Sequence, residues 1–295
     1  MSPRLVGVGL VVIMALFLFL PFGSAVVKSF LAYDAARPER TGEFVGAENY
    51  SSLFLREPEF FSSLRATGVT LAAGLAQCLI AFALALWLDR LWPFRLPSFL
   101  SLSLVFPLLL SPTLVALMGR LYLHDQVGPV ARLLVASGLS ASTRAPLTTT
   151  GNAFFWLCML DAWQWIPFCA LLFWLCFRVV PQRMLEAAAI DGLSRGAMLR
   201  WVILPRITPF LVSVVLIRVL EVVRLFDLPN VLTGGGPGTA TLTVSIYATR
   251  VTFAHQRFGV ASAHMLVIYT LVSLAIVPLL RRAKKLRALI KGQAQ

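Results

Sequence analysis

The sequence is poor in charged side chains, and this scarcity already excludes several classes of protein. Only 13% of its 295 residues are charged, whereas a soluble domain has about 25%. Apolar residues make up 58% of the chain, and its mean hydropathy is +0.82. One soluble core could not bury so many apolar side chains. We therefore expect an all-α integral membrane protein, because helices satisfy their own backbone hydrogen bonds in lipid.

Acidic residues are scarcer still, with 13 Asp and Glu against 26 Lys and Arg and a formal net charge of +13. In a soluble protein such an excess would suggest nucleic acid as a partner. No folded nucleic-acid-binding module accompanies it here. The basic tail at Arg281–Lys291 fits an anchor on anionic lipid instead. We expect the lipid bilayer, and no nucleic acid, as the partner of these charges.

Several chemical motifs are missing. The four cysteines all lie in apolar stretches, without a CxxC pair, at Cys78, Cys158, Cys169 and Cys176. The three histidines show no HExxH spacing, and neither a Walker motif nor a GxSxG motif occurs. We therefore expect free thiols, no metal site, no catalytic residues and no cofactor in this chain. If the protein depends on ATP, a separate ATPase must hydrolyse it.

Six stretches are long and apolar enough to cross a bilayer, which takes roughly 20 helical residues. They are about residues 5–31, 63–88, 97–121, 153–177, 209–226 and 258–280. The first follows Arg4 as a signal peptide would, but it is too long, and no small-residue cleavage site follows it. We expect six membrane-spanning helices, the first of them retained.

Basic residues predict the orientation of these helices. With the N-terminus inside, the inner segments hold 14 basic residues and the outer loops hold 9. The outer nine lie in longer loops, where basic residues count for less than in short ones. We therefore expect both the N-terminus and the C-terminus to be cytoplasmic.

The inner loop at about residues 179–208 is the longest on its face and is predicted to be helical. Asp191-Gly192 breaks a first short helix, because glycine suits a left-handed C-terminal position. Ser194 can cap a second one, which we expect Pro205 and Pro209 to end. Two short helices of this kind form either a rigid protrusion for a soluble partner or an ordinary connection.

A motif in this loop favours the protrusion. Glu186-Ala187-Ala188 is followed after two residues by Asp191-Gly192, and Leu204-Pro205 ends thirteen positions after Gly192. The arrangement resembles the EAA signature of ABC importer permease subunits. It departs from that signature at Leu193 and Val202, where alanine and isoleucine are usual.

In that family the loop is the coupling helix that sits in a cleft of the ATPase subunit. Small side chains allow a partner to approach closely, and a carboxylate can bind a partner's arginine. The resemblance implies that coupling to the ATPase involves Glu186, Ala187, Ala188, Asp191, Gly192, Leu204 and Pro205.

A second motif narrows the family. The segment Phe226–Pro237 reads FDLPNVLTGGGP and resembles the segment after the fifth helix of carbohydrate permeases of the MalF, UgpA and SugA type. Phe258–Ala263 is similar to the start of their last helix, and Gly46–Tyr50 is a weaker match to their first outer loop. Together the resemblances cover about residues 44–280 and point to carbohydrate uptake.

The family resemblance implies a MetI- and MalF-like transmembrane domain with cytoplasmic coupling helices, as one permease domain over residues 1–295. It implies a bacterial inner membrane location and a transporter subunit that is not itself an enzyme. The implied partners are a second homologous permease subunit, two ATPase subunits that carry ATP and Mg, and an extracytoplasmic solute-binding protein. ATP-driven closure of the ATPases would switch the cavity by alternating access.

Charged residues in the fifth predicted helix are the first candidates for the solute path. A charge at the centre of a span costs about 2.5–3.5 kcal/mol on insertion, so it usually faces a cavity or a partner. Arg218, Glu221 and Arg224 follow each other at intervals of three. They form either a polar wall of the path or an internal salt bridge of Glu221 with both arginines.

The fourth predicted helix supplies further candidates, Asp161, Trp163, Gln164 and Trp165. Helical spacing places Asp161, Gln164 and Trp165 on one face, where aromatic rings could stack on a sugar. The alternative is an interfacial tryptophan belt beside a proline kink.

Two further candidates, Asn230 and Thr233, lie at the expected outer mouth of the path. Trehalose, maltose and other oligosaccharides fit these expectations. The two arginines of the fifth helix keep a glycerol phosphate ester open as an alternative. An ion-coupled secondary transporter is a second alternative, although no repeat of one half in the other is visible.

Overall fold

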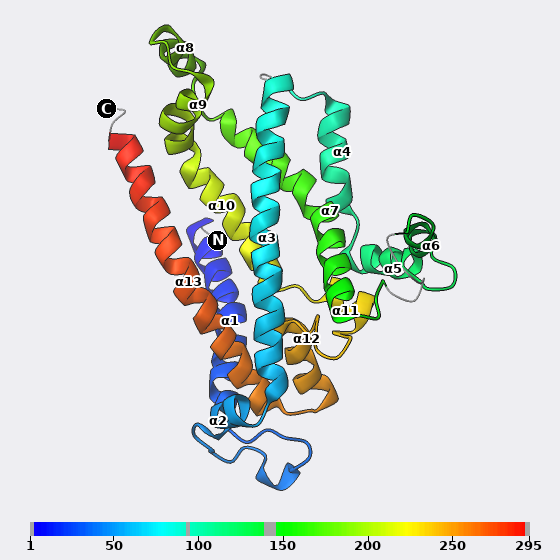
Figure 1. Ribbon diagram of the computed structural model, residues 1–295. Helices are drawn as coiled ribbons and strands as arrows, with labels where there is room; N and C mark the ends of the chain where they lie inside the picture. The colour runs from blue at the N-terminus through cyan, green and yellow to red at the C-terminus, as the bar shows by residue number, and fades with distance from the viewer. Residues whose placement is uncertain (1–2, 93–94, 139–145, 293–295) are drawn as a thin grey trace. The chain divides into compact units, whose positions relative to one another are not determined.

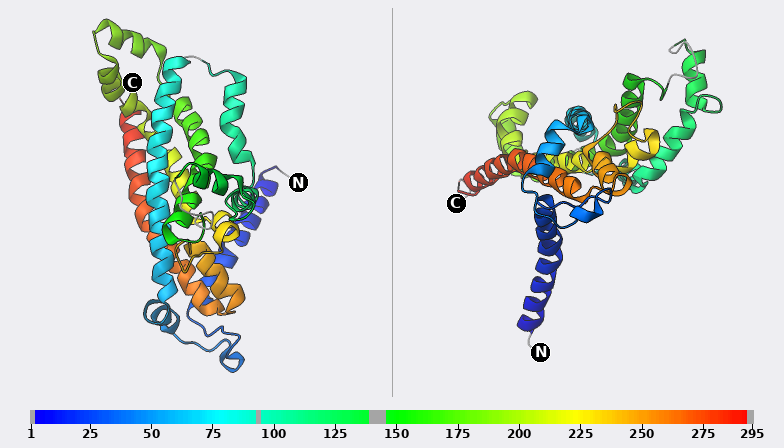
Figure 2. Two further views of the ribbon diagram at one scale, coloured as in Figure 1. Left: turned by 45° about the vertical axis from the view of Figure 1, so that its right-hand side comes forward. Right: turned by 90° about the horizontal axis from the view of Figure 1, so that it is seen from below.

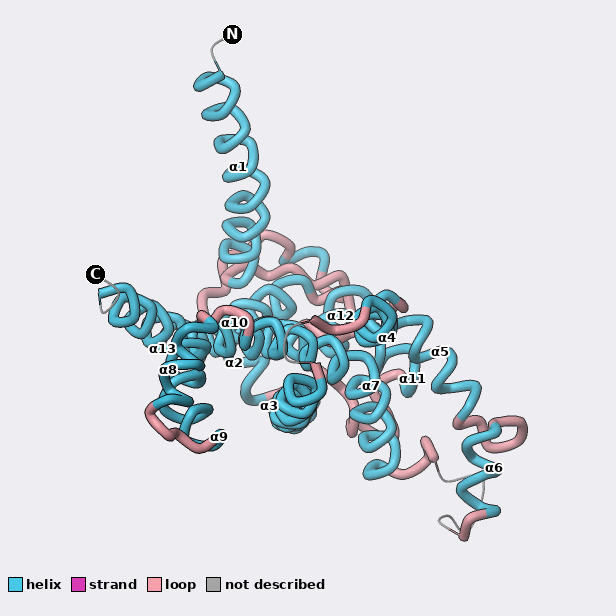
Figure 3. Tube along the Cα trace, turned by 90° about the horizontal axis from the view of Figure 1, so that it is seen from above, coloured by secondary structure: helices cyan, strands magenta, loops and turns pink. Residues whose placement is uncertain are grey.

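The computed structural model describes residues 3–92, 95–138 and 146–292, and its regular elements are helices (Figures 1 and 3). No β-strand occurs within these ranges, which agrees with the predicted all-α class. In chain order the α-helices are α1 (Pro3–Ser29), α2 (Glu48–Leu55), α3 (Pro58–Leu91), α4 (Ser98–Leu109), α5 (Pro112–Tyr122), α6 (Pro129–Ala136), α7 (Thr150–Phe177), α8 (Gln182–Ile190), α9 (Arg195–Met198), α10 (Leu204–Val223), α11 (Asp227–Thr233), α12 (Val244–Thr249) and α13 (Phe258–Gly292). Pro38–Arg40 forms a 3₁₀ turn, and Leu199–Ile203 and Arg250–Ala254 are π-helical.

Within the described ranges, five helical segments are long and apolar enough to cross a membrane. They are Val12–Ser29, Pro58–Leu91, Thr150–Phe177, Arg195–Val223 and Phe258–Pro278. These correspond to five of the six predicted spans. The sixth, expected at residues 97–121, is present only if the bent pair of α4 and α5 counts as one span.

The third predicted span is therefore not a single straight helix. Between α4 and α5 the chain bends by 84°. Proline at 112 disfavours continuation of the preceding helix, because its ring crowds an earlier carbonyl and it has no N–H to donate, whereas it suits the first turn of a new helix. A new helix starts there instead, and the Ser111 side chain accepts a hydrogen bond from the Leu114 N–H at 3.2 Å.

The expected end of the second inner helix at Pro205 and Pro209 is also wrong. From α9 the chain continues through the π-helical residues Leu199–Ile203 into α10, which contains Pro209. Pro205 falls in the first turn of α10, where a missing N–H does little harm. The wider π-turn before it places the Leu204 N–H on the Leu199 carbonyl. The fifth span thus starts earlier than the predicted residue 209.

The chain packs as two compact units, one of residues 1–61 and 244–274 and the other of residues 62–243 and 275–295. In the first unit, Asn49 joins separate segments by donating from Nδ2 to the carbonyls of Ser29 at 2.8 Å and Leu31 at 2.9 Å. Gly259 lies against the Leu31 carbonyl and the Asn49 side-chain amide. A Cβ there would come within 2.7 Å of the Leu31 oxygen, so only glycine fits.

The first unit also has an ion-pair cluster and an aromatic cluster. Arg257 pairs with Glu57 and donates to Ser52 Oγ at 3.1 Å. The rings of Phe60 and Tyr247 lie on buried His264, with centroids 5.6 and 4.9 Å away. By contrast α1, the blue helix of Figure 2, is only 6% buried over Val12–Ser29, as expected for a helix that meets lipid.

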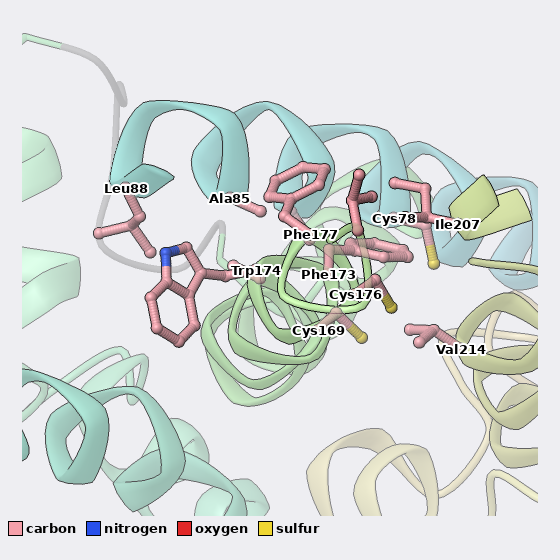
Figure 4. Packing of buried hydrophobic residues seen from close by; sticks show 13 residues of the cluster. Cys78, Ala85, Leu88, Cys169, Phe173, Trp174, Cys176, Phe177, Ile207 and Val214 are labelled. Carbon is pink, nitrogen blue, oxygen red and sulfur yellow. The ribbon is translucent and has the colours of Figure 1, made fainter. Parts of the chain in front are cut away.

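In the second unit, α3 packs against α7 through small residues that face large ones (Figure 4). Ala81 and Ala85 are fully buried, and their spacing of four places them on one face of α3. Phe173 and Phe177 of α7 are also buried, with the Phe82 ring edge-on to both at 5.7 and 5.8 Å. The four cysteines are free and at least partly buried, which confirms the expected packed thiols.

Candidate functional site

Inside the second unit, a buried ion pair joins α10 to α7. The side chains of Arg218 and Asp161 are only 1% and 2% exposed, and the guanidinium contacts the carboxylate directly. Arg218 Nη2 also donates to Gln77 Oε1 of α3 at 2.9 Å, and the guanidinium carbon lies 4.9 Å from the Trp165 ring centroid. Burial of a charge is tolerated only when it is paired and hydrogen-bonded. We call Gln77, Asp161 and Arg218 the three-helix network.

The internal salt bridge expected in the fifth helix is only half present. Glu221 pairs with Arg224 at 2.9 Å, on the surface, with side chains 34% and 74% exposed. Arg218 does not join this pair, because its partner is Asp161 on another helix. Residues three apart on a helix are close neighbours. Two such steps separate Arg218 from Arg224, however, and together they turn the helix by about 120°, so Arg218 faces the interior and Arg224 the surface.

A polar cavity of about 350 Å³ lies beside the network. It brings together six of the nine predicted path residues, namely Asp161, Gln164, Trp165, Arg218, Glu221 and Arg224. Its other walls are Leu108, Pro112, Leu225, Phe226 and Asp227. The shared face predicted for Asp161, Gln164 and Trp165 is thus confirmed, and all three line one cavity.

Trp163 does not belong to this cavity. It is 46% exposed, because two residues beyond Asp161 along a helix is nearly half a turn away. Trp165 and Trp163 therefore have different surroundings. The stacking surface expected in the path fits Trp165, and the interfacial belt fits Trp163. Trp165 lies on the cavity, whereas Trp163 has the exposure expected of an interfacial residue.

Gln164 has a local structural role that sequence reasoning missed. Its Nε2 donates to the Leu110 carbonyl at 2.7 Å, at the bend between α4 and α5. The helix break deprives this carbonyl of a regular partner, and a buried carbonyl without one is costly. Gln164, itself 2% exposed, therefore stabilises the bend from the neighbouring helix α7.

Asn230 and Thr233 lie on α11, at a second cavity of about 420 Å³ that Arg120 and Gly234 also line. Thr233 Oγ1 donates to the Pro229 carbonyl at 3.0 Å and lies 2.6 Å from Thr241 Oγ1. Gly234 ends α11 in the left-handed region with φ of 64°, which explains the glycine at this position of the motif. Neither Asn230 nor Thr233 reaches the polar cavity.

The predicted inner loop forms two helices around a glycine break, at the end of α10 remote from α11 (Figure 1). We call residues 182–205 the hinge segment. Gly192 has φ of +77°, its N–H donates to the Ala189 carbonyl at 3.1 Å, and the Leu193 N–H donates to the Ala188 carbonyl at the same distance. These two bonds are the Schellman arrangement, in which a hydrophobic residue commonly follows the glycine. Leu193 fits this position.

The rest of the hinge segment is mostly open to solvent. Glu186, Ala187 and Asp191 are exposed, whereas Ala188 is buried. Ser194 caps α9 as predicted, accepting from the Ala197 N–H at 3.3 Å. Two large apolar side chains are left uncovered, Ile190 at 86% and Trp201 at 69%. Such exposed apolar groups beside a carboxylate are typical of a surface that meets another protein.

An ion pair lies at the base of the hinge segment. Arg178, the residue after α7, pairs with Asp89 of α3 and lies over the Trp174 ring, 4.7 Å from its centroid. Partial burial lowers the pKa of the Arg178 guanidinium, yet it keeps its charge at neutral pH. The pair borders a cavity of about 430 Å³ that Pro181 and Leu185 also line.

Sequence reasoning did not identify Gln77, Phe226 and Asp227 as site residues. Gln77 had a signal, because it is the one strongly polar residue in the apolar run from Leu71 to Leu88. Phe226 and Asp227 belong to the recognised FDLP motif, but nothing in the motif says which way they face. Among the described residues, no group of three His, Cys, Asp or Glu side chains could hold a metal ion.

Comparison with known proteins places this geometry in a family. A family model described as the binding-protein-dependent transport system inner membrane component matches residues 78–285. The sulfoquinovosyl glycerol transport system permease protein SmoG of Agrobacterium fabrum is 27% identical over 267 residues, covering 88% of this chain and 83% of that protein. The trehalose/maltose transport system permease protein MalF of Thermococcus litoralis is 36% identical over 126 residues, covering 43% and 42%.

The fold is also similar to that of solved proteins. A chain of a bacterial ABC transporter involved in the import of the acidic polysaccharide alginate superimposes with a TM-score of 0.75. The two chains are 18% identical, and the match covers 96% of this chain and 95% of the other. The arrangement of helices is thus that of an ABC importer transmembrane domain.

Proposed function

This chain belongs to the family of inner membrane components of binding-protein-dependent transport systems, and we propose that it forms one half of a path for carbohydrate uptake. As a member of this family it is a membrane-spanning permease subunit of an ABC importer, and a transporter subunit, not an enzyme. Family membership decides against the ion-coupled secondary transporter that the sequence left open.

The observation that carries the proposal is the polar cavity beside the three-helix network. It combines an aromatic face at Trp165 with carboxylates at Glu221 and Asp227, on helices that otherwise present apolar side chains. Sugars offer C–H faces to aromatic rings and hydroxyl groups to carboxylates. The relatives SmoG and MalF are named for transport systems of sulfoquinovosyl glycerol and of trehalose and maltose, which supports a carbohydrate as the solute here. Trehalose and maltose are the first solutes to try.

The hinge segment supplies the second part of the proposal, coupling to a separate ATPase. Glu186, Ala187, Ala188, Asp191, Gly192, Leu204 and Pro205 would meet the ATPase or fix the shape that meets it. Exposed Ile190 beside exposed Glu186 provides an apolar and an acidic contact. The ATPase subunits would bind ATP and Mg, since this chain has no Walker motif. Closing of the ATPases would move α8 and α9 and switch access to the path.

The remaining partners follow from the size of the chain. Five or six spans are too few to enclose a path alone, so a second permease subunit would complete it. A solute-binding protein would deliver solute from outside, and both termini would lie in the cytoplasm. The whole chain, residues 1–295, would act as one permease domain in a bacterial inner membrane. The terminal residues 1–2 and 293–295 themselves lie outside the described part.

Solute-stimulated ATPase activity of the purified complex tests the function directly. The tagged chain is expected to co-purify with an ATPase subunit, and a binding protein loaded with the right sugar should raise ATP hydrolysis. A panel of sugars and glycerol phosphate esters identifies the solute. Failure of any ATPase to co-purify, under conditions that keep the permease folded, would contradict the proposal.

A transport variant tests the cavity itself. Glu221→Gln should lower sugar uptake while the protein reaches the membrane at normal levels, because the change keeps the side chain's size and removes an acceptor charge. Asp125→Asn is the matched control, since Asp125 lies outside the cavity, beside His124. Equal uptake by both variants would remove Glu221 from the path.

A further inference from the structure

A charged pocket in the first unit belongs neither to the proposed path nor to the hinge segment. Its volume is about 300 Å³, and it lies between α2, the loop that precedes α2 and the start of α13 (Figure 1). Four arginines and three carboxylates line it, so the ionised lining has a net positive charge. These residues are Arg37, Arg40, Arg56 and Arg257, with Asp34, Glu48 and Glu57.

Backbone hydrogen bonds hold the walls of this pocket in place. The Ala32 N–H donates to the Glu43 carbonyl at 2.8 Å, which closes the loop before α2 on itself. The Gly259 N–H donates to the Tyr33 carbonyl at 3.1 Å, which ties the same loop to α13. The pocket is thus formed within the chain itself, and a ligand that enters it does not have to order the loop first.

Each carboxylate of the lining already has an arginine beside it. Arg257 pairs with Glu57, and its Nε lies 3.9 Å from Asp34 Oδ2. Arg40 Nη2 lies 3.6 Å from Glu48 Oε2. The three carboxylates therefore have their counter-charges in two of the four arginines, which leaves two arginines over.

The two remaining arginines are Arg37 and Arg56. Both line the pocket and are exposed, and neither forms an ion pair within the part of the chain that the structure describes. The guanidinium group is a planar fork that binds a carboxylate through two parallel hydrogen bonds. Because the pocket's own carboxylates are already paired, these two side chains suit a carboxylate that another molecule supplies.

Apolar side chains next to the pocket indicate that the other molecule is a protein. Phe44 and Leu55 are direct neighbours in sequence of the lining residues Val45 and Arg56, and their side chains are 75% and 82% exposed. Arginine and aromatic residues are enriched at protein–protein interfaces, and exposed apolar groups commonly mark them. A small anion would bind the arginines but would leave both apolar side chains in water.

The order of the spans indicates the side of the membrane on which the pocket lies. One span, which ends at Val223, separates the hinge segment from residues 224–257, and no candidate span lies within that range. Arg257 forms an antiparallel bridge with Asp34. The pocket is therefore on the membrane side away from the hinge segment, where the proposed function places the solute-binding protein.

We infer that this pocket is a docking site for the solute-binding protein, and that Arg37 and Arg56 receive an aspartate or glutamate side chain from its surface. This inference rests on the proposed function, which supplies the partner. Phe44 and Leu55 add apolar contacts at the edge of the same site. The paired arginines, Arg40 and Arg257, hold the walls and take no part in the contact.

The first test titrates the solute-binding protein that stimulates ATP hydrolysis against the purified complex in phosphatidylcholine vesicles. Arg37→Gln and Arg56→Gln should each raise the concentration for half-maximal stimulation by about threefold, and the double variant by about tenfold, with basal and maximal rates unchanged. High salt should weaken the wild type more than the double variant, because ions screen exposed charges. Arg95→Gln is the matched control, since Arg95 is exposed and lies between α3 and α4, outside the pocket. A double variant with the half-maximal concentration of the wild type would overturn the inference.

A second set of vesicles distinguishes a protein partner from a lipid. The same titration is repeated with phosphatidylglycerol in the membrane, and the loss of affinity in the double variant should be present in both lipids. A loss that appears only with phosphatidylglycerol would assign the two arginines to a lipid headgroup and overturn the inference.

Photocrosslinking locates the contact directly. The photoreactive residue p-benzoylphenylalanine in place of Phe44 should crosslink to the solute-binding protein on illumination, next to an acidic residue of that protein. The same replacement of Phe17 is the control, because Phe17 is 79% exposed but lies within the apolar span of α1. Equal crosslinking at the two positions would contradict docking at the pocket.

The wild-type complex separates this inference from the proposed function. If a solute-binding protein stimulates the wild type and the double variant at the same concentrations, the proposed function holds and the inference fails. If no solute-binding protein stimulates the wild type, the proposed function fails, and the inference with it.

Discussion

The three-helix network and the hinge segment, both in the second unit, are built in opposite ways. The network joins Gln77, Asp161 and Arg218 across up to 141 positions of sequence, and its side chains are almost inaccessible. The hinge segment is made by residues within a few positions of each other, and most of them are exposed. The network therefore depends on how three helices pack, whereas most of the hinge segment is exposed to a possible partner. Substitutions should therefore affect stability at the network and coupling at the hinge.

The largest expected effect is at the ion pair. Asp161→Leu should lower the free energy of unfolding by about 3–5 kcal/mol, because it leaves Arg218 buried without a counter-charge. The double variant Asp161→Leu with Arg218→Leu should recover most of that loss, since no charge is then buried. Thermal denaturation of the purified complex and its level in the membrane check both. A single variant as stable as wild type would show that the pair is not a structural element.

A smaller loss of stability is expected at the bend between α4 and α5. Gln164→Leu removes the donor to the Leu110 carbonyl and should cost about 1–3 kcal/mol. Gln126→Leu is the control, because its side chain is exposed, and the same thermal measurement applies. If the two variants have the same denaturation midpoint, the bend does not depend on Gln164.

At the glycine break, stability should change little while coupling is lost. Gly192→Ala places a Cβ at φ of +77° and should cost about 1–2 kcal/mol locally. The strain turns α8 relative to α9, so solute-stimulated ATP hydrolysis should fall several-fold. Gly196→Ala is the matched control. It lies in α9 with open space around it, and alanine there favours the helix by about 1 kcal/mol. Full coupling in Gly192→Ala would mean that the angle of the break is unimportant.

The smallest effect on stability is expected at Glu186. Its side chain is exposed, so Glu186→Gln should leave the denaturation midpoint unchanged, because surface groups contribute little. Coupling should nevertheless decline, since a partner's arginine loses its counter-charge. The ratio of stimulated to basal ATP hydrolysis measures this. If Glu186→Gln lowered the denaturation midpoint but not this ratio, Glu186 would have a structural role and no role in coupling.

Much of the hinge segment could be predicted from the sequence, because its geometry is local. Asp191-Gly192 predicted a left-handed break and Ser194 a cap, and both are present. The second inner helix was predicted to end at Pro205 and Pro209. Instead, the π-helical residues Leu199–Ile203 lead directly into α10, which has Pro205 in its first turn. The bend between α4 and α5 was not predicted either, because both helices are apolar and hydropathy carries no information on a change of direction between them.

The network was out of reach for a different reason. Charges at 161 and 218 could be recognised as unusual within spans, but their pairing depends on how α7 and α10 are rotated about their axes. The neighbouring Glu221 was an equally good partner by sequence spacing. Only the packed chain shows that α10 presents Arg218 to Asp161 of α7 and to Gln77 of α3.

By itself, the sequence determined that this protein belongs in a membrane and which loop carries the signature of its family. These properties depend on composition and on spacing over a few residues. Only the tertiary structure decided which charges are paired: Arg218 with Asp161 of another helix, and Arg224 with Glu221. Pairing is decided by distances between side chains on different helices, and a distance of that kind is a property of the packed chain.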